Sequence, residues 1–600
     1  MKSRLITALA IQAALLSGAA AAADNTSKVP VNPQRNAYFG ELHLHTGMSF
    51  DAFLIGTRVY PETGYLYARG EEVEVSGKKF RRKPLDFCAV TDHSEYLGQM
   101  YVASLPNGPL ANTIWAKAIA SEPVGQRLLR MFSLSETYGS GAYEPPELLD
   151  PAQLKTNWKR QIDAAENAYQ PGKFTTFVGY EWSSLPNGAN LHRNVIFKGP
   201  KYPELPFSSV DSAIPEELWR YLEHQRGLGI ESLAIPHNSN VSDGLMFSYA
   251  DSKRDPINNE YATRRTSLER LVEITQQKGT SETRPELSPD DEFADFENVD
   301  SLLTVPRKSS VNGGYVRQAL GRGLEIEQRV GANPFEFGVI GSSDVHSGLV
   351  NSDEKLAPGN LDNPPDVQRL LEVNPQFSYT AVKGSTAGVA GVWAESNTRE
   401  SIYDALHRRE TFATSGTHLR VRLFAGFDYP SGLTKQRNWV KKAYDTGFAM
   451  GSDVSGSKAN GKPLRILVQA VKDPDAGNLD RIQIVKVWLE DGKAKERIFD
   501  VAWAGNRAAD AKGRVPAIGN SVNVEQATYT NDIGANELIA DWQDPTFRAD
   551  QTAVYYARVL EIPTPRWSTY LAVQNKLPVP TSVPSTIQER AWTSPIYYRP

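Results

Sequence analysis

Short apolar segments alternate with helical patterns from about residue 37 to about residue 420, and this alternation is the strongest constraint on the fold. The strand-like segments are AYFGELHLHT, LDFCAVTDH, FTTFVGYEWSS, NVIFKG, ESLAIPHNSN, RLVEITQQ and EFGVIGSSDVH. The segments with helical spacing are LKTNWKRQIDAAENAY, IPEELWRYLEHQRGLG, GGYVRQALGRGLEIEQRV and RESIYDALHRRE. Strands and helices in alternation predict βαβ units and a mostly parallel sheet or barrel, the α/β fold class.

The pattern changes after about residue 420. Segments such as PLRILVQAVK, RIQIVKVWLED and AVYYARVLEI alternate apolar and polar residues with little helical periodicity. They predict a C-terminal antiparallel β domain over 421–600, a sandwich packed against a first domain of residues 24–420. Two stretches of the first domain, near 98–155 and 243–300, are rich in Pro, Ser and charge and are predicted to be insertions that shape or cover a site.

The first 23 residues have the three parts of a secretory signal peptide. Lys2 and Arg4 precede an apolar run, and small residues end at Ala23. The run is too short for a comfortable membrane span, and no later segment offers about twenty apolar residues. We expect cleavage near Ala23 and a periplasmic or secreted protein of a Gram-negative bacterium, with no membrane span after cleavage. An uncleaved anchor is the alternative.

The net charge and the number of cysteines limit which partners the protein can be expected to bind and how its fold can be stabilised. The net charge is −5 and basic stripes are absent, so nucleic acid is not expected as a partner. The expected partner is a small-molecule substrate. Cys88 is the only cysteine and lies in an apolar strand pattern, which predicts a buried, inert thiol. An exported chain without an intramolecular disulfide depends on its core, on metals, or on both. The oligomeric state is left open.

Polar residues that can bind metals end the predicted strands. In parallel α/β folds the carboxyl ends of strands converge on one rim, where sites are built. Six of the nine histidines fall in these motifs, whereas His224, His407 and His418 lie in charged contexts typical of solvent exposure. Imidazole with carboxylate suits zinc, manganese or iron, so the clustering predicts a site for two or three divalent ions. The strand-end residues are His43, His45, Asp92, His93, Glu181, His192, His237, Asp344 and His346.

These motifs resemble the PHP (polymerase and histidinol phosphatase) metallohydrolases. The shared features are H-x-H-T-x-x-S, a T-D-H, a middle Glu, a later His and a terminal D-x-H, in order from His43 to His346. The most similar branch is exported and catalogued as a domain of unknown function, with a more distant likeness to carbamate-hydrolysing enzymes. The resemblance implies a distorted seven-stranded β/α barrel with insertions; the C-terminal β region lies outside the motifs.

The resemblance also implies a role for each residue. His43, His45, Glu181 and Asp344 would hold a first metal, and Glu181 would bridge to a second. The second would be held by His192 and His237, although His192 fits the family only by position. The remaining implied ligands, His93, His346 and Asp51, would hold a third metal. Asp51 stands where many relatives have histidine, and it can alternatively orient His45 from outside the ligand set. Asp92 is expected to support a ligand rather than to be one.

Two cations bridged by Glu181 can share a water and lower its pKa, giving a hydroxide nucleophile. The predicted catalytic residues are Glu181, Asp344 and His237, and the predicted substrate contacts are Arg193, Asn238 and Asn240. The leading expectation is a metal-dependent phosphoesterase, because a metal cluster suits an anionic group that bridges ions. The alternatives are hydrolysis of a carbamate, carboxylic ester or amide at the same cluster, and a non-catalytic metal-stabilised binding module.

Overall fold

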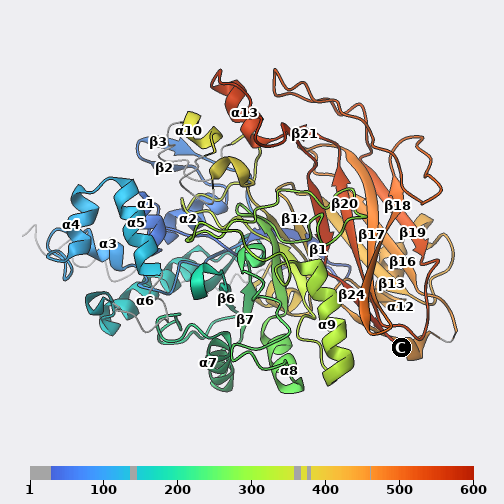
Figure 1. The fold of residues 1–600 in the computed structure, drawn as a ribbon, viewed down its shortest axis with the longest axis horizontal. Coiled ribbons are helices and arrows are strands. Elements are labelled where there is room, and N and C mark those ends of the chain that lie inside the picture. The colour runs from blue at the N-terminus through green and yellow to red at the C-terminus, as the bar shows by residue number, and fades with distance from the viewer. Residues whose placement is uncertain (1–28, 136–144, 357–366, 374–379, 460) are drawn as a thin grey trace, which may run out of the picture.

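Among the described residues, 13 strands form one mixed sheet that runs through the protein (Figure 1). The structure is a computed structural model, and it describes residues 29–600 except 136–144, 357–366, 374–379 and 460. The strand order is β15-β24-β20-β23-β12-β11-β1-β4-β5-β6-β7, with β17 paired to β20 and β18 to β17. The strands are β1 (Asn36–Glu41), β4 (Phe87–Val90), β5 (Thr175–Trp182), β6 (Arg193–Phe197), β7 (Ser232–Pro236), β11 (Val389–Ala394), β12 (Thr411–Thr414), β15 (Asp453–Ser455), β17 (Leu479–Glu490), β18 (Lys493–Trp503), β20 (Ala553–Glu561), β23 (Arg590–Thr593) and β24 (Ile596–Arg599).

The N-terminal half of this sheet is only partly parallel, which differs from the predicted mostly parallel sheet. β1, β4 and β5 pair in parallel, whereas β6 and β7 extend the sheet antiparallel. A separate three-stranded sheet contains β8 (Leu271–Gln276), β9 (Gly279–Thr280) and β10 (Gly338–Gly341), with β8 parallel to β10. β7 and β8 are not paired within the described chain, so the two sheets are not joined into a closed ring there. The fold is therefore mixed α/β, with polar strand ends gathered at one edge.

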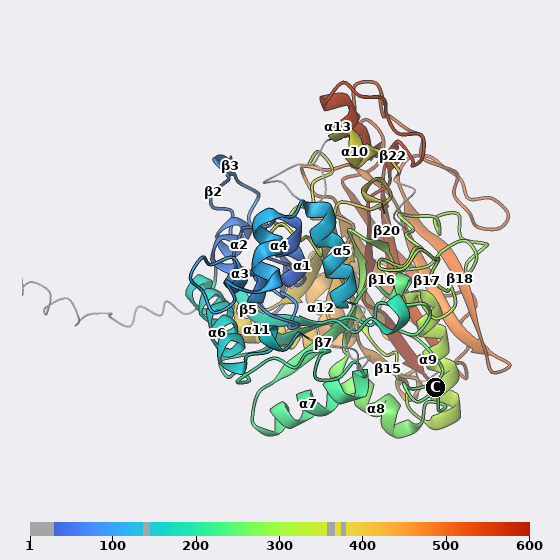
Figure 2. The same cartoon turned by 60° about the vertical axis from the view of Figure 1, so that its left-hand side comes forward.

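The helices predicted between the strands are present. α6 begins after Asp150, whose carboxylate accepts a hydrogen bond from Ala152 N at 3.0 Å, and it buries Trp158. α6 and α7 each have proline in the first turn, where a missing N–H costs nothing. In both Figures 1 and 2, α7 and α8 lie together below the sheet. The helices here are α2 (Pro61–Ala68), α6 (Pro151–Ala168), α7 (Pro215–Gly227), α8 (Asn259–Leu268), α9 (Val316–Val330) and α11 (Arg399–His407).

The two predicted insertions differ in structure. Within 98–155, the described residues form α3 (Gln99–Ala103), α4 (Ile114–Ser121), α5 (Val124–Ser135) and the start of α6. Their apolar side chains share one core with α1 (Phe50–Ile55), the helix that carries Asp51. The range 243–300 contains α8, β8 and β9, so it supplies a strand paired to β10. Both ranges therefore support strand ends or helices that carry candidate site residues.

The C-terminal region contains a second, four-stranded antiparallel sheet. Its strands are β13 (Arg420–Gly426), β14 (Phe448–Ala449), β16 (Arg465–Val471) and β19 (Glu537–Gln543). Val421 and Ile466 of this sheet share a buried apolar core with Ile484 and Tyr555 of the large sheet. Two packed layers agree with the predicted sandwich. One pairing differs from an all-antiparallel arrangement, because β15 and β24 are parallel.

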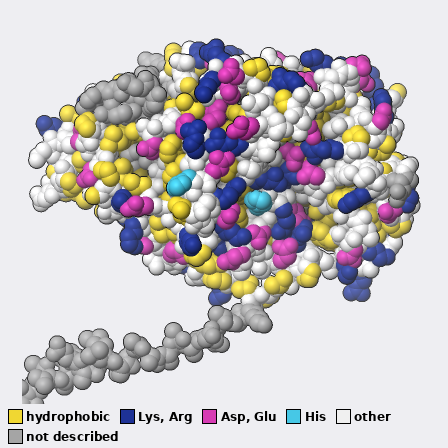
Figure 3. Space-filling view, turned by 90° about the horizontal axis from the view of Figure 1, so that it is seen from below, with side chains coloured by type: hydrophobic (Ala, Val, Ile, Leu, Met, Phe, Trp, Pro, Cys, Tyr) yellow, Lys and Arg dark blue, Asp and Glu magenta, His cyan; other side chains and the backbone are white. Residues whose placement is uncertain are grey.

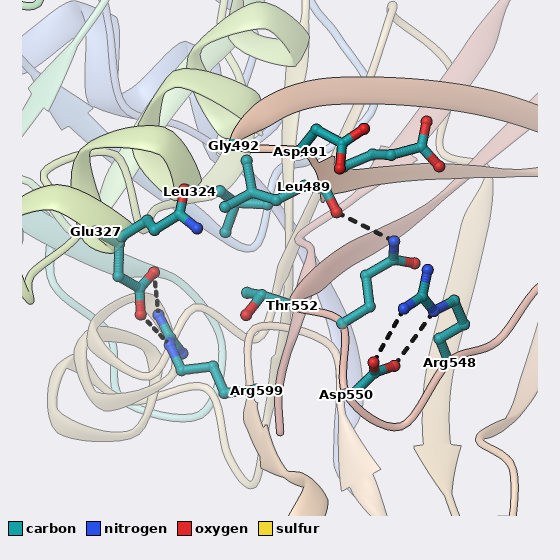
Figure 4. A pocket seen from close by; sticks show the side chains of 12 residues that line it. Leu324, Glu327, Leu489, Asp491, Gly492, Arg548, Asp550, Thr552 and Arg599 are labelled. Atoms are coloured by element: carbon teal, nitrogen blue, oxygen red, sulfur yellow. Dashed lines mark hydrogen bonds and ion pairs between the residues drawn. The ribbon is translucent and has the colours of Figure 1, made fainter.

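Helix α9 packs closely against the β17–β18 hairpin. A Cβ on Gly321 would lie 2.6 Å from Ala494 Cβ, so glycine permits this approach. A polar pocket of about 440 Å³ opens beside the contact (Figure 4). The ion pairs Arg599–Glu327 and Arg548–Asp550 form part of its walls. The first pair ties the end of β24 to α9, and the second lies within one loop of the C-terminal region.

A second polar cavity, of about 550 Å³, lies between the segment after His346 and the C-terminal strands. Glu561, at the end of β20, lines this cavity and is fully buried, and Thr417 Oγ1 donates a hydrogen bond to it at 2.7 Å. Burial raises the pKa of the Glu561 carboxyl from 4.5 to about 8. A carboxyl whose pKa rises on folding binds a proton more tightly in the folded state. Its contribution to stability therefore falls as the pH rises from about 4.5 to about 8.

We expect Glu561→Gln to increase the free energy of unfolding by about 2–4 kcal/mol at pH 8 and by less than about 1 kcal/mol at pH 5. The amide keeps an acceptor for Thr417 but cannot ionise. Urea denaturation of both proteins at the two pH values measures the difference. An equal effect at pH 5 and pH 8 would show that the carboxyl does not titrate as its burial predicts.

Surface features agree with the small net charge. On the face shown in Figure 3, basic and acidic side chains are interspersed and neither sign dominates. No helix of the described chain is long and apolar enough to span a membrane. The predicted signal peptide, residues 1–23, lies outside the described residues. Cys88 is buried, as predicted, and burial raises the pKa of its thiol well above the usual range.

Candidate metal centre

His43 and His45 follow β1 on one face of an extended segment. Leu42 and Leu44 alternate with them and are fully buried. Leu44 bridges Val345, and His45 N donates to Val345 O at 3.0 Å. This bridge places the segment after β1 beside the segment after β10, although about 300 residues separate them. The alternation therefore directs both imidazoles toward the same site.

The other predicted ligands come from the ends of neighbouring elements. His93 follows β4 and bridges Glu181 of β5, and His237 follows β7. His192 directly precedes β6, which runs antiparallel to β5. The first residue of β6 therefore lies at the same edge of the sheet as the last residues of β5. Asp344 has a φ of 54°, a left-handed conformation that aspartate tolerates better than most residues. All nine predicted ligands meet at one edge of the sheets.

Glu181 lies between two pairs of histidines. Its Oε2 is 3.2 Å from His43 Nε2 and 2.9 Å from His45 Nε2. Its Oε1 is 2.6 Å from His192 Nδ1 and 3.1 Å from His237 Nε2. The two oxygens thus face different donor pairs, which is the geometry of a carboxylate that can bridge two ions.

Asp51 reaches the opposite end of the cluster. Its Oδ2 lies 3.1 Å from His93 Nε2 and 2.9 Å from His346 Nε2. Its Oδ1 accepts a hydrogen bond from Ser49 Oγ at 2.7 Å, and Ser49 Oγ is 3.1 Å from His45 Nδ1. The sequence left two roles for Asp51, a ligand of the third metal or a residue that orients His45. The contacts are compatible with both, because one oxygen lies beside two candidate ligands and the other connects through Ser49 to His45.

Three groups have donor atoms close enough to share an ion. In each group the donor atoms lie within 4.8 Å of one another. His192 is outside these groups, despite its contact with Glu181. His43 and His45 each belong to two of them, which differs from the single assignment of each drawn from the sequence. The groups are His45, Asp51, His93 and His346; His43, Glu181 and His237; and His43, His45 and Asp344.

Unpaired buried atoms show that these residues fit a metal. His45 Nε2 and Asp344 Oδ1 are buried and make no hydrogen bond of suitable geometry, although other donor atoms of the cluster lie within 3.4 Å of each. Leaving such atoms unpaired costs about 1–3 kcal/mol each. The donors are imidazole nitrogens and carboxylate oxygens, which suit zinc, manganese or iron. A divalent ion would satisfy both unpaired atoms at once.

The charges of the cluster also suit cations. Burial opposes the ionisation of Glu181 and Asp51, but the neighbouring histidines hold the pKa of both carboxyls well below the usual range. Burial lowers the pKa of His45 to about 4, with His346 adding to the effect. Burial also opposes protonation of His93, but Glu181 and Asp51 raise the pKa of His93 to about 10. Metal binding would displace such protons.

The structure adds supporting residues that the motifs did not indicate. Glu273 of β8 contacts His43 Nδ1 through Oε2 at 3.0 Å, and Ser183 Oγ hydrogen-bonds to His93 Nδ1. Such partners fix the orientation of an imidazole and leave its other nitrogen for a ligand role. The available sequence signal for Glu273 was a lone acid within the apolar strand LVEIT. Asp92 accepts hydrogen bonds from Thr46 N and Oγ1, which agrees with the expected supporting role.

The three predicted substrate contacts occupy different environments. Arg193 is buried, and its Nε donates to Glu269 at 3.0 Å rather than to the cluster. Asn240 donates to Lys278 O at 3.1 Å and Val299 O at 2.8 Å, so it holds a loop. Asn238 lies within the cluster, 3.3 Å from Asp344 Oδ2. Only Asn238 is in direct contact with a candidate ligand.

The three remaining histidines lie away from the centre. His224 and His407 are exposed, as predicted. The prediction for His418 was wrong, because its ring is half-buried and stacks on Phe39 with centroids 4.5 Å apart. Burial lowers the pKa of His418 to about 4.

A family model matches most of the chain. A family described as "Protein of unknown function (DUF3604)" matches residues 32–600. Among solved structures, the chain is similar to a two-domain protein of Bacteroides vulgatus described as containing predicted PHP-like metal-dependent phosphoesterase. Sequence identity is 10%, the alignment covers 78% of this chain and 85% of the other, and the TM-score is 0.30. No curated protein matches the chain. A structural similarity this low carries no argument about chemistry.

Proposed function

The chain belongs to the DUF3604 family, and we propose that it is a metal-dependent hydrolase of the PHP type that cleaves a phosphoester. The observation that carries this proposal is Glu181, whose two oxygens face separate histidine pairs. A carboxylate placed in this way is suited to bridging two cations, and Asp51, His93 and His346 would complete a third position. An anionic phosphoryl group is well suited to a cluster of cations.

Residue roles follow from the contacts. Asp344 would hold the first ion with His43 and His45, and Glu181 would join it to a second ion at His237 and His192. When bound, divalent ions supply Lewis-acid chemistry: they acidify water and stabilise negative charge on the group under attack. Glu273 holds the His43 ring, and Ser183 holds the His93 ring. These contacts pre-organise the donors, so little reordering is needed when ions bind.

The proposal extends to architecture and location. β1, β4, β5, β6, β7, β8 and β10 would constitute the seven strands of a distorted β/α barrel, open between β7 and β8. Residues 1–23 would direct export and be removed, giving a periplasmic or secreted enzyme. Zinc, manganese and iron are the candidate ions, with a small molecule as substrate.

Metal analysis combined with model substrates tests the function. The purified protein would be analysed by inductively coupled plasma mass spectrometry, stripped with a chelator, and reloaded with zinc, manganese or iron. We expect two or three bound ions per chain. Hydrolysis of p-nitrophenyl phosphate or bis(p-nitrophenyl) phosphate should be lost on stripping and recovered on reloading. A mock-treated sample, carried through the same steps without chelator, is the control. It shows that the loss of activity comes from removal of the ions and not from handling.

Three outcomes would contradict the proposal in different ways. Cleavage of p-nitrophenyl acetate or a carbamate, without cleavage of phosphoesters, would favour carbonyl chemistry at the same cluster. Bound metal without turnover of any model substrate would favour a metal-stabilised binding module. Absence of bound metal after reloading would remove the basis for all three functions.

A further inference from the structure

Lys278 brings a positive charge to the edge of the candidate metal centre. It lies in the turn between β8 and β9, and its Nζ forms an ion pair with Asp344 Oδ2. The turn is held on both sides: Asn240 donates to Lys278 O at 3.1 Å, and Lys278 N donates to the side-chain oxygen of Gln276. The backbone of Lys278 is therefore fixed, and the ammonium is directed at the cluster.

Asp344 uses its two oxygens for different purposes. Oδ1 faces His43 Nε2 at 3.3 Å and His45 Nε2 at 3.4 Å and has no hydrogen-bond partner. Oδ2 accepts from Lys278 and from Gln276 Nε2, the latter at 2.6 Å. Oδ1 can serve as a metal ligand while Oδ2 keeps its partners. Lys278 therefore does not compete with an ion for Asp344.

Lys278 stands out among basic residues near the site. Asp51, Glu181 and Asp344 are the three carboxylates among the predicted ligands. Across the described chain, Lys278 is the only Lys or Arg that forms an ion pair with any of them. Arg193, the basic residue favoured by the sequence, is instead paired with buried Glu269.

Exposure indicates the side from which a substrate enters. The His43 and His237 side chains are 0% exposed, whereas those of Asp51, His346 and Lys278 are 14%, 16% and 17% exposed. Lys278 and His346 both contact Asp344, so they lie at the same accessible edge. An ammonium has three N–H donors, and the pair with Asp344 occupies one of them.

We infer that Lys278 binds the anionic group of the substrate at the accessible edge of the centre, which makes the substrate a phosphomonoester or phosphodiester rather than a neutral ester. This inference rests on the proposed function. An ammonium held beside the cluster attracts a negatively charged group and fixes it next to the donors. A neutral carbonyl substrate would gain much less from the same cation.

The test compares Lys278→Met, Lys278→Gln and Lys278→Arg with the metal-loaded wild-type protein. Isothermal titration with inorganic phosphate measures anion binding without turnover, and mass spectrometry measures bound metal. We expect the Met and Gln variants to keep their metal and to bind phosphate about 10- to 100-fold more weakly, with partial recovery in the Arg variant. Their KM for bis(p-nitrophenyl) phosphate should rise more than kcat falls. Lys308→Met, at an exposed position paired with Asp300, is the matched control.

The outcomes separate this inference from the proposed function. Unchanged phosphate affinity in the Met and Gln variants, with metal retained, would overturn the role of Lys278 and leave the hydrolase proposal standing. Loss of metal in both variants would also overturn it, because Lys278 would then position Asp344 instead of binding substrate. Phosphate binding that depends on Lys278, in a protein that cleaves no phosphoester, would support the anion site and contradict the proposed function.

Discussion

Glu181→Gln is expected to reduce hydrolysis by about 1000-fold or more, equivalent to about 4 kcal/mol of activation free energy, and to lower the bound metal by at least one ion per chain. The substitution preserves the size of the side chain but removes its charge. Both donor pairs lose a shared anionic partner, because Oε1 contacts His192 and His237 while Oε2 contacts His43 and His45. Metal analysis and initial rates on a model phosphoester measure the two effects.

Glu74→Gln is the matched control, since Glu74 is exposed on the β2–β3 hairpin (Val73–Val75 and Lys78–Phe80). It should retain metal and activity. Thermal unfolding of metal-stripped samples shows whether Glu181→Gln preserves the fold. A folded Glu181→Gln protein with wild-type metal content and wild-type rate would eliminate Glu181 as a bridging ligand.

Arg558→Met is expected to destabilise the protein by about 3–5 kcal/mol, because removal of one partner leaves buried charges uncompensated. Arg558 of β20 binds both oxygens of Asp291, at 2.9 and 2.7 Å, and also contacts Glu282. Arg317 of α9 pairs with the same two acids. All four side chains are buried. The lost partner therefore leaves two carboxylates against one guanidinium, and urea denaturation at pH 7 measures the cost.

The pH dependence distinguishes a charge effect from lost packing. Burial opposes ionisation of Glu282, but Arg558 and Arg317 lower its pKa to about 2. Stability from this carboxylate is present above its unfolded pKa of about 4.5 and is lost as the pH falls toward 2. The cost of Arg558→Met should consequently shrink at pH 4. Arg548→Met, which removes an exposed pair with Asp550, should leave the stability nearly unchanged. Equal costs for the two variants would contradict the buried network.

The sequence predicted the parts of the site that depend on local pattern. Two-residue spacing placed His43 and His45 on one face, and strand-end positions placed His93, His237 and Asp344 at one edge. Pattern could not predict partners that come from distant segments. Glu273 lies 230 residues from His43, and Lys278 lies still further along the chain. Nothing local marks their side chains as directed toward His43. Their roles depend on the pairing of β8 with β10.

The direction of side chains was the second feature that the sequence did not predict correctly. Arg193 follows His192 directly, and strand alternation turns it away from the centre toward Glu269. Asn240 has a polar side chain near the site but uses it to hold the Lys278 turn. The sequence also separated two domains by texture, whereas hydrogen bonding continues from β1 through β11 and β12 into the C-terminal strands. The pattern of apolar and polar residues indicates burial and helical periodicity, but it does not indicate which strands are neighbours.

The position of β23 affects the order of folding events. This four-residue strand, Arg590–Thr593, pairs with β12 on one side and β20 on the other. It therefore links, by backbone hydrogen bonds, the half of the large sheet that carries the candidate metal centre to the C-terminal half. The link cannot form until residue 593 has been synthesised, long after the first strands. Such high contact order slows folding, and it leaves the nascent chain without its complete sheet during most of translation.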